Sequence, residues 1–241
     1  NSLPTSHFQS LKSVFMAEDI NKYALVSVFK SVTDSIPNEE ISILQALYKI
    51  NNGTYRHLIE PLHTLIAQGN KDAYSEEKKK LPAFTPCGTF EGSRKADNCK
   101  TYTQYIILDI DKLNPADIDS IKIKISEIPF TFCCFISPSG CGLKVLVKVN
   151  SKVTEHQQAF NQLKTIYENG LGIEIDKSGK DISRLCFYSY DSKIFFNYSA
   201  KIFMLQHQLS KQQIITTDTN NLTAQNELNI YKKCVQLTNR K

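Results

Sequence analysis

The sequence lacks several signals that would place it at once in a familiar class of protein. No apolar run approaches the roughly 20 residues that a membrane helix needs. The opening residues, 1–4, have neither a basic segment nor an apolar one, so no signal peptide is expected. There is no Walker motif, no Ser-His-Asp arrangement and no His-x-His pair. A membrane protein, a P-loop ATPase, a serine hydrolase and a rolling-circle nickase are therefore not indicated.

Paired cysteine motifs are also absent. The seven cysteines are scattered without a C-x-x-C pair, so reduced thiols in a cytoplasmic protein are expected. Cys133 and Cys134 stand together in an apolar run and are predicted to be buried as small hydrophobic side chains. A zinc site built from Cys87, Cys99 and a histidine stays open as an alternative, although its spacing matches no familiar zinc pattern.

The net charge of +5 is mild. Such a balance is compatible with binding to nucleic acid or nucleotide phosphates, but it does not by itself indicate either. The only dense basic run is residues 78–80, which we interpret as the solvated end of a helix.

Three regions are predicted along the chain. Residues 1–80 have apolar side chains mostly at helical spacing and are predicted to form an N-terminal helical flank, although residues 23–29 fit a strand equally well. Residues 81–203 are punctuated by proline and glycine, as strands and turns are, and are predicted to form the core. Residues 204–241 are predicted to be a polar tail that links to a further C-terminal module.

The core region predicts an α+β fold. Its elements are expected in the order strand, helix, strand, strand, helix, strand, which is typical of ferredoxin-like and RNA-recognition-motif-like (RRM-like) domains. Such a domain has a four-stranded antiparallel sheet with both helices on one face, which leaves the other face free for a ligand. The expected strands are residues 105–110, 130–136, 143–149 and 185–188, and the expected helices are residues 115–128 and 154–170.

Asp109 and Asp111 form the first candidate site. They end a strongly apolar strand, and because residues two apart lie on the same side of a strand, both carboxylates are expected to point together. Two like charges at a buried strand end are costly unless a cation neutralises them. Oxygen ligands of this kind suit Mg²⁺ or Mn²⁺. The alternative is that both are solvated turn residues, and the D-x-D pattern alone does not decide.

The second candidate site is the glycine-rich turn at residues 137–144. Gly140 and Gly142 would let backbone N–H groups approach a phosphate closely, and Lys144 adds a positive charge. The alternative is a plain hairpin with a solvated lysine.

A third carboxylate is expected from the segment before the last predicted strand. Asp176 precedes Arg184 by eight residues, and it is expected to reach the first candidate site because strand four neighbours strand one in a ferredoxin-like sheet. Asp181 and Asp191 are competing candidates. Together the three sites would form a two-metal centre for phosphoryl transfer beside a triphosphate cradle.

These motifs resemble those of archaeo-eukaryotic primases. Residues 107–111 resemble the first primase motif, residues 137–144 the second, and Asp176 with Arg184 the third. Over residues 25–198 the chain resembles more closely the BT4734-like and VirE-type N-terminal domains of Bacteroides mobile elements. The segments that carry this resemblance are residues 81–85, 88–90 with Arg94, 108–113, 137–144 and 181–184.

The resemblance implies a primase-polymerase-like fold and a metal-dependent nucleotidyltransferase that acts in DNA replication of a mobile element. Its substrates would be a nucleoside triphosphate and single-stranded or primed nucleic acid, its cofactor Mg²⁺ or Mn²⁺, and its partner a fused or associated helicase-type ATPase, with no membrane involved. Asp109, Asp111 and Asp176 would bind the metal and form the catalytic centre. The residues expected to bind the nucleotide are Ser137, Ser139, Gly140, Gly142, Lys144, Arg94 and Arg184.

One position departs from the primase pattern. The second primase motif usually ends in histidine, and Lys144 stands in that place. A lysine pairs with a triphosphate, but when charged it cannot accept a hydrogen bond. The alternative function is therefore a non-catalytic module that binds single-stranded DNA or nucleotides and regulates a fused helicase or ATPase.

Overall fold

The structure is a computed structural model in which residues 23–207 are described. Contacts divide the chain into two units, residues 1–205 and 206–241, and the fold below is that of the first unit. Apart from residues 204–207, the predicted tail lies outside the described residues, as does the start of the predicted N-terminal flank. No helix within residues 23–207 has the length and apolar character that crossing a lipid bilayer requires.

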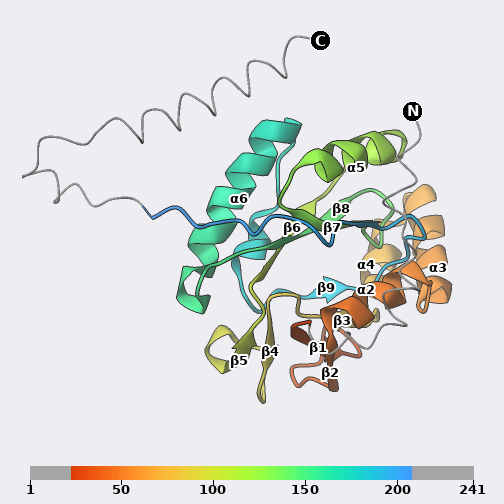
Figure 1. Ribbon diagram of the computed structural model, residues 1–241. Coiled ribbons are helices and arrows are strands. Elements are labelled where there is room, and N and C mark those ends of the chain that lie inside the picture. Colours follow the sequence, from red (N-terminus) through yellow and green to blue (C-terminus); the bar gives the residue numbers. More distant parts are fainter. Residues whose placement is uncertain (1–22, 208–241) are drawn as a thin grey trace, which may run out of the picture. The chain divides into compact units, whose positions relative to one another are not determined.

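The first sheet joins strands from widely separated parts of the chain (Figure 1). Its order is β2-β1-β3-β9, and all its pairs are antiparallel. β1 (Leu25–Phe29) and β2 (Glu39–Ser42) come from the predicted helical flank, whereas β3 (Ala83–Phe84) and β9 (Cys186–Phe187) come from the predicted core. The N-terminal region is therefore not a purely helical flank, because β1 pairs with strands of both regions.

Three helices follow β2, and helical structure was predicted for this part of residues 1–80. α2 (Ile43–Asn51) begins at a capping box in which the side chains of Ser42 and Gln45 each accept the other's backbone N–H, at 3.2 and 2.9 Å. α3 (Arg56–Ala67) and α4 (Lys71–Lys79) complete the region. α4 has no fully buried side chain, but its Tyr74 is partly buried against the small cluster of Ile59, Leu62 and Leu81.

The second sheet carries the candidate site and has the order β10-β7-β8-β6. Three of its strands and the two helices between them along the chain confirm the predicted order strand, helix, strand, strand, helix. These are β6 (Tyr105–Ile110), α5 (Ile118–Glu127), β7 (Thr131–Ile136), β8 (Leu143–Lys148) and α6 (His156–Leu171). The other elements are β10 (Phe195–Phe196), a hairpin of β4 (Gly88–Phe90) and β5 (Cys99–Tyr102), and 3-10 turns at Ala96–Asn98, Pro115–Asp117, Val153–Glu155 and Lys177–Lys180.

The predicted placement of the fourth strand is wrong. Residues 185–188 were expected beside β6, but Cys186–Phe187 pairs with β3 in the first sheet, and β10 lies beside β7 instead. The free edge of β6 is covered by the segment that begins at Asp176, whose N–H donates to the Asp109 carbonyl oxygen at 2.9 Å. Because this segment meets the edge of β6, no fourth strand pairs there. The fold is mixed α+β with antiparallel sheets, but the ferredoxin-like strand order is not formed.

Both faces of the second sheet are covered (Figure 1). Ile106, Leu108 and Ile110 share a core cluster with apolar residues of α5 and α6, so these helices lie on one face as predicted. Tyr105 and Ile107 share a second cluster with α2 and the first sheet. The face expected to be free for a ligand is therefore covered by the N-terminal region. Burial on both faces also explains why β6 is apolar at every position except Asp109.

After β10 the chain continues as an extended segment with alternating burial. Phe203 and Leu205 are buried, whereas Ile202 and Met204 are exposed by 53% and 56%. Phe203 also forms a parallel bridge with Val149. The alternation is that of an extended chain with one side on the core.

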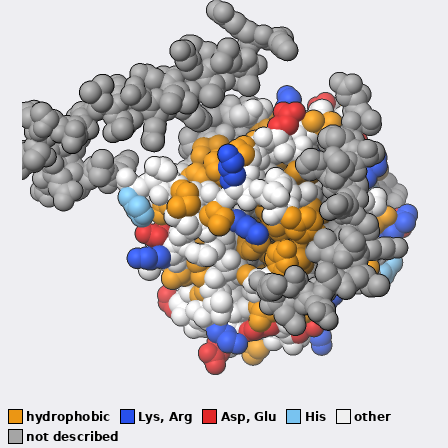
Figure 2. Space-filling model, viewed as in Figure 1, with side chains coloured by type: hydrophobic (Ala, Val, Ile, Leu, Met, Phe, Trp, Pro, Cys, Tyr) orange, Lys and Arg blue, Asp and Glu red, His pale blue; other side chains and the backbone are white. Residues whose placement is uncertain are grey.

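Figure 2 shows one face of the molecule, on which hydrophobic side chains gather near the centre with Lys or Arg side chains among them and acidic side chains toward the rim.

Gly179 is required where the turn at Lys177–Lys180 passes β6. A Cβ at this position would lie 2.5 Å from the Ile107 carbonyl oxygen and 2.6 Å from Cε2 of Phe160. Both neighbours belong to the buried core, so Gly179→Ala is expected to lower the free energy of unfolding by about 1–3 kcal/mol, measured by urea unfolding. Gly170→Ala is the control, because its nearest neighbouring atom would lie 4.0 Å away. An equal loss in both variants would exclude a clash at Gly179 as the cause.

Candidate functional site

An ion pair between Asp109 and Lys144 lies at the centre of the candidate site. The two residues are cross-strand partners in β6 and β8, and Lys144 Nζ donates a hydrogen bond to Asp109 Oδ1. The side chains of Asp109 and Lys144 are exposed by only 7% and 9%. Arg184 Nη2 lies 3.9 Å from Asp109 Oδ2. Positively charged groups therefore lie beside both oxygens of this carboxylate.

The charge state of Lys144 follows from its surroundings. Burial by itself lowers the pKa of Lys144, but the charge of Asp109 and its hydrogen bond, together with the charge of Asp111, outweigh burial and raise this pKa. The ammonium is therefore protonated at neutral pH, as binding to an anion requires.

Asp111 lies just past the end of β6, and its side chain is exposed. The turn between β7 and β8 folds back onto this strand end at Gly142. A Cβ at Gly142 would lie 2.5 Å from the Ile110 carbonyl oxygen and 3.3 Å from Asp111 Oδ1. Since no larger side chain fits without moving the backbone, glycine at this position is what brings the turn beside Asp111.

The turn between β7 and β8 is held by its own serines. The hydroxyl groups of Ser137 and Ser139 share a hydrogen bond at 3.0 Å, and Ser139 Oγ accepts the Cys141 N–H at 3.2 Å. Gly140 has a φ of 72° and donates its N–H to the Ser137 carbonyl oxygen at 3.0 Å. The N–H groups of Gly140 and Cys141 are thus used inside the turn. The Gly140 N–H, which was expected to approach a phosphate, is therefore already occupied in this conformation.

Asp176 lies next to Asp109, but by a route that the sequence does not predict. Its N–H donates to the Asp109 carbonyl oxygen from the 3-10 turn that borders β6, not from a segment that leads into a neighbouring strand. Its exposed carboxylate accepts the Ser178 N–H at 2.5 Å. Hydrogen bonding from Ser178, assisted by the charges of Arg184 and Lys144, lowers the pKa of Asp176. This carboxylate is therefore ionised at neutral pH.

Arg94 supports the segment that carries Arg184. Its Nη1 donates to the Ser183 carbonyl oxygen at 2.9 Å, and its guanidinium lies 5.7 Å from the centre of the Phe29 ring. Asp181 holds the same segment by accepting the Ser183 N–H and hydroxyl at 2.9 and 2.8 Å. The Nε atoms of Arg94 and Arg184 are buried without a hydrogen-bond partner in the described part of the chain.

A family model described as BT4734-like, N-terminal domain matches residues 76–196, which is half of the chain. The chain belongs to the BT4734-like N-terminal domain family. All of the predicted site residues lie within the match, which begins inside α4 and ends with β10. No curated protein and no solved structure matches the chain.

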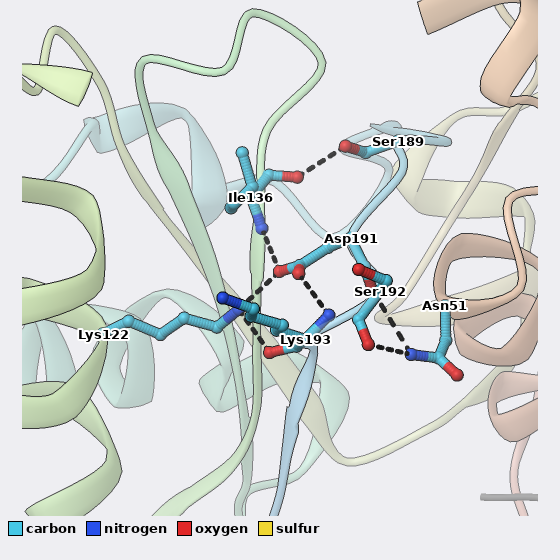
Figure 3. A network of polar contacts seen from close by, with 7 residues as sticks. All are labelled: Asn51, Lys122, Ile136, Ser189, Asp191, Ser192 and Lys193. Carbon is cyan, nitrogen blue, oxygen red and sulfur yellow. Dashed lines mark hydrogen bonds and ion pairs between the residues drawn. The ribbon is translucent and has the colours of Figure 1, made fainter. Parts of the chain in front are cut away.

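Asp191 of this BT4734-like domain is bound in a buried polar network (Figure 3). Its Oδ2 accepts from Lys122 Nζ at 2.5 Å and from the Ile136 N–H at 3.0 Å, and its Oδ1 accepts the Lys193 N–H at 2.9 Å. The side chains of Lys122 and Asp191 are exposed by 7% and 3%. Because these contacts occupy both carboxylate oxygens, Asp191 links α5 and β7 to the segment after β9 instead of facing Asp109.

Lys78 is a residue of the site region that the sequence interpretation missed. Burial lowers the pKa of Lys78, and the charges with the next largest effects on it are those of Lys144, Asp111, Asp109 and Arg184. The ammonium of Lys78 therefore lies near the charged residues of the candidate site, not on a fully solvated helix end.

The sequence does contain a signal that separates Lys78 from the rest of the basic run. Lys79 and Lys80 each follow a glutamate by three residues, whereas Lys78 follows Ser75 at that spacing. Acid–base pairs three or four residues apart hold a lysine on the helix surface. Lys78 has no such partner and is the lysine that turns inward.

The alternative zinc site at Cys87 and Cys99 is not formed by the described residues. Within residues 23–207, no group of three or more His, Cys, Asp or Glu side chains is arranged to hold a metal ion. Burial raises the pKa of Cys87 to about 12, so its thiol is protonated at neutral pH. Cys133 and Cys134 are fully buried, as predicted.

Proposed function

We propose that this BT4734-like domain is a metal-dependent nucleotidyltransferase of the primase-polymerase type that acts in DNA replication of a mobile element. The observation that carries the proposal is the buried Asp109–Lys144 pair with Arg184 beside it. Asp111 follows Asp109 by two residues, and the Asp176 N–H donates to the Asp109 carbonyl oxygen; both side chains are exposed. Nucleotidyl transfer uses cations that bind the phosphates and carboxylates that bind divalent metals.

In the proposed reaction, the 3′ oxygen of a nucleic acid chain forms a bond to the α-phosphorus of a nucleoside triphosphate. The bond between the α-phosphorus and pyrophosphate breaks, and the hydroxyl proton passes to water or to a carboxylate of the site. Lys144 would pair with a phosphate as a point charge, and Arg184 would bind phosphate oxygens through its planar guanidinium. Ser139 would add a hydroxyl donor from the turn.

The three predicted ligands have the donor type that a divalent metal needs, although within residues 23–207 no three such side chains are gathered in an arrangement that would hold one. Asp109, Asp111 and Asp176 offer hard carboxylate oxygens, which suit Mg²⁺ or Mn²⁺, and a bound ion would neutralise phosphate charge. Lys144 holds Asp109 Oδ1 in the present structure. We therefore expect Lys144 to exchange Asp109 for a phosphate when a nucleotide binds.

A second candidate function is non-catalytic. In it the domain binds a nucleotide or single-stranded DNA and regulates a fused or associated helicase-type ATPase. The observation that favours it is that buried Lys144 already neutralises Asp109, at the position where the primase motif has histidine. Such a site would bind triphosphates through its cations and would show no template-dependent incorporation.

Nucleotide incorporation by the double variant Asp111→Asn/Asp176→Asn separates the two functions. Both side chains are exposed, so the substitutions are expected to leave folding intact. The wild-type chain is expected to incorporate labelled nucleotides on single-stranded or primed templates with Mg²⁺ or Mn²⁺. The double variant is expected to lose about 100-fold or more of this rate, because it lacks two charged groups that act on the transition state.

Asp119→Asn is the matched control, since Asp119 is an exposed acid on α5, and its rate is expected to equal that of the wild type. Incorporation that survives in the double variant would remove these carboxylates from the mechanism. Triphosphate binding by the wild-type chain without incorporation, under either metal and on either template, would favour the regulatory function.

A further inference from the structure

The three lysines that end α4 have different surroundings. Lys79 Nζ lies 2.7 Å from Glu76 Oε1, and Lys80 Nζ lies 2.6 Å from Glu77 Oε1. These four side chains are exposed by 50% or more. Lys78 is only partly exposed, and the ion pairs of this run among residues 23–207 are those of Lys79 and Lys80. Its position therefore does not come from the surface ion pairs that hold its two neighbours.

The Lys78 ammonium lies over two aromatic rings. Its Nζ is 5.7 Å from the centre of the Tyr74 ring, one helical turn earlier, and 5.4 Å from the centre of the Phe187 ring in β9. Cation–π attraction places an ammonium over a ring but leaves its N–H groups able to donate to an acceptor. Phe187 follows Arg184 by three residues, so β9 brings Lys78 to the same part of the chain as Arg184.

The side of α4 that carries Lys78 faces the candidate site. Tyr74 lies four residues before Lys78, on the same side of the helix. Burial raises the pKa of Tyr74, and a hydrogen bond with Ser139 of the glycine-rich turn opposes this rise. Two residues of α4 thus meet the site independently, Tyr74 at the turn and Lys78 beside the charges of Lys144 and Asp111.

We propose that Lys78 is a further phosphate-binding residue, which brings a third cation from α4 to the triphosphate held by Lys144 and Arg184. This inference rests on the proposed function, because it assigns a further contact to the ligand of that site. In the present structure the carboxylate of Asp109 offsets the charges of Lys144 and Arg184, and a triphosphate that draws Lys144 away from Asp109 would place further negative charge within reach of all three cations. The proposal also gives the region before the predicted core a direct part in ligand binding.

Lys78→Met tests the proposal, because methionine keeps a long apolar side chain against the two rings and removes the charge. The dissociation constants of ATP and dATP for the full chain, measured calorimetrically with Mg²⁺ present, are expected to rise about 10-fold or more, as loss of a charged hydrogen bond implies. Lys79→Met and Lys80→Met remove the same charge from the same run, and their dissociation constants are expected to stay within about 2-fold of wild type. Lys78→Arg is expected to recover most of the affinity.

The possible outcomes separate this proposal from the proposed function. Wild-type affinity in a folded Lys78→Met chain, verified by circular dichroism, overturns the role of Lys78 and leaves the proposed function standing. An equal loss in all three methionine variants also overturns it, because the effect then reflects net charge alone. Absence of ATP and dATP binding by the wild-type chain overturns the proposed function, and the role of Lys78 with it.

Discussion

Lys144→Met is expected to lower the free energy of unfolding of this BT4734-like domain by about 3–5 kcal/mol. Methionine is close to lysine in length, so the loss comes from the charge and not from a cavity. Without the ammonium, the Asp109 carboxylate stays at 7% exposure and loses its hydrogen-bonded partner. Arg184 compensates little, because it lies 3.9 Å from the other oxygen and its side chain is 42% exposed. Asp109→Asn is expected to be similarly destabilising, since it leaves Lys144 buried and unpaired.

The double variant Asp109→Asn/Lys144→Met shows whether unpaired charge causes the losses. It removes both charges together and is expected to be more stable, by about 2 kcal/mol or more, than the sum of the single losses implies. Urea unfolding of the four chains gives this coupling free energy. Glu76 and Lys79 form an exposed pair at 2.7 Å, and the same four-chain comparison there is expected to show almost no coupling. A coupling at Asp109 and Lys144 as small as at the exposed pair would argue against a tight buried ion pair.

The parts of the fold that the sequence predicts correctly have strong local patterns. β6, β7 and β8 are six-residue strands rich in apolar side chains, and α5 and α6 have apolar side chains at helical spacing. β9 and β10 are two residues long and carry no such pattern. Their partners, β3 and β7, are selected by packing between distant segments, which local spacing does not encode. The fourth strand was therefore predicted at the right residues but in the wrong sheet.

The candidate site was predictable in residue type but not in pairing. The spacing of Asp109 and Asp111, and the glycines before Lys144, are local features that the sequence displays directly. Alternation places Lys144 on one face of β8, but the register that sets it opposite Asp109 depends on how the two strands pair. The spacing of glutamates separates Lys78 from Lys79 and Lys80, but the contact of α4 with the glycine-rich turn depends on tertiary packing, which local spacing does not encode.

Asp191→Asn is expected to cost about 3–5 kcal/mol of stability as well, because the carboxylate holds several elements together (Figure 3). It accepts from Lys122 of α5, from the Ile136 N–H of β7 and from the Lys193 N–H. The Asn51 side chain of α2 joins the network by donating to the Asp191 carbonyl oxygen at 3.3 Å. An asparagine keeps the shape, but it leaves Lys122 without a counter-charge at 7% exposure and turns one acceptor into a donor.

The free energy of unfolding of Asp191→Asn, measured in urea with and without Mg²⁺, distinguishes this structural role from metal binding. The loss is expected to be the same in both conditions, because Lys122 neutralises the carboxylate. Lys124→Met, an exposed lysine on the same helix, is the control and is expected to change stability by less than about 0.5 kcal/mol. Unchanged stability with lost affinity for Mg²⁺ or Mn²⁺ would instead make Asp191 a metal ligand in place of Asp176. If the expected loss is found, the contacts of Asp191 fix the position of the chain just after β9. Because Arg184 lies just before β9, the same contacts then help to keep Arg184 near Asp109.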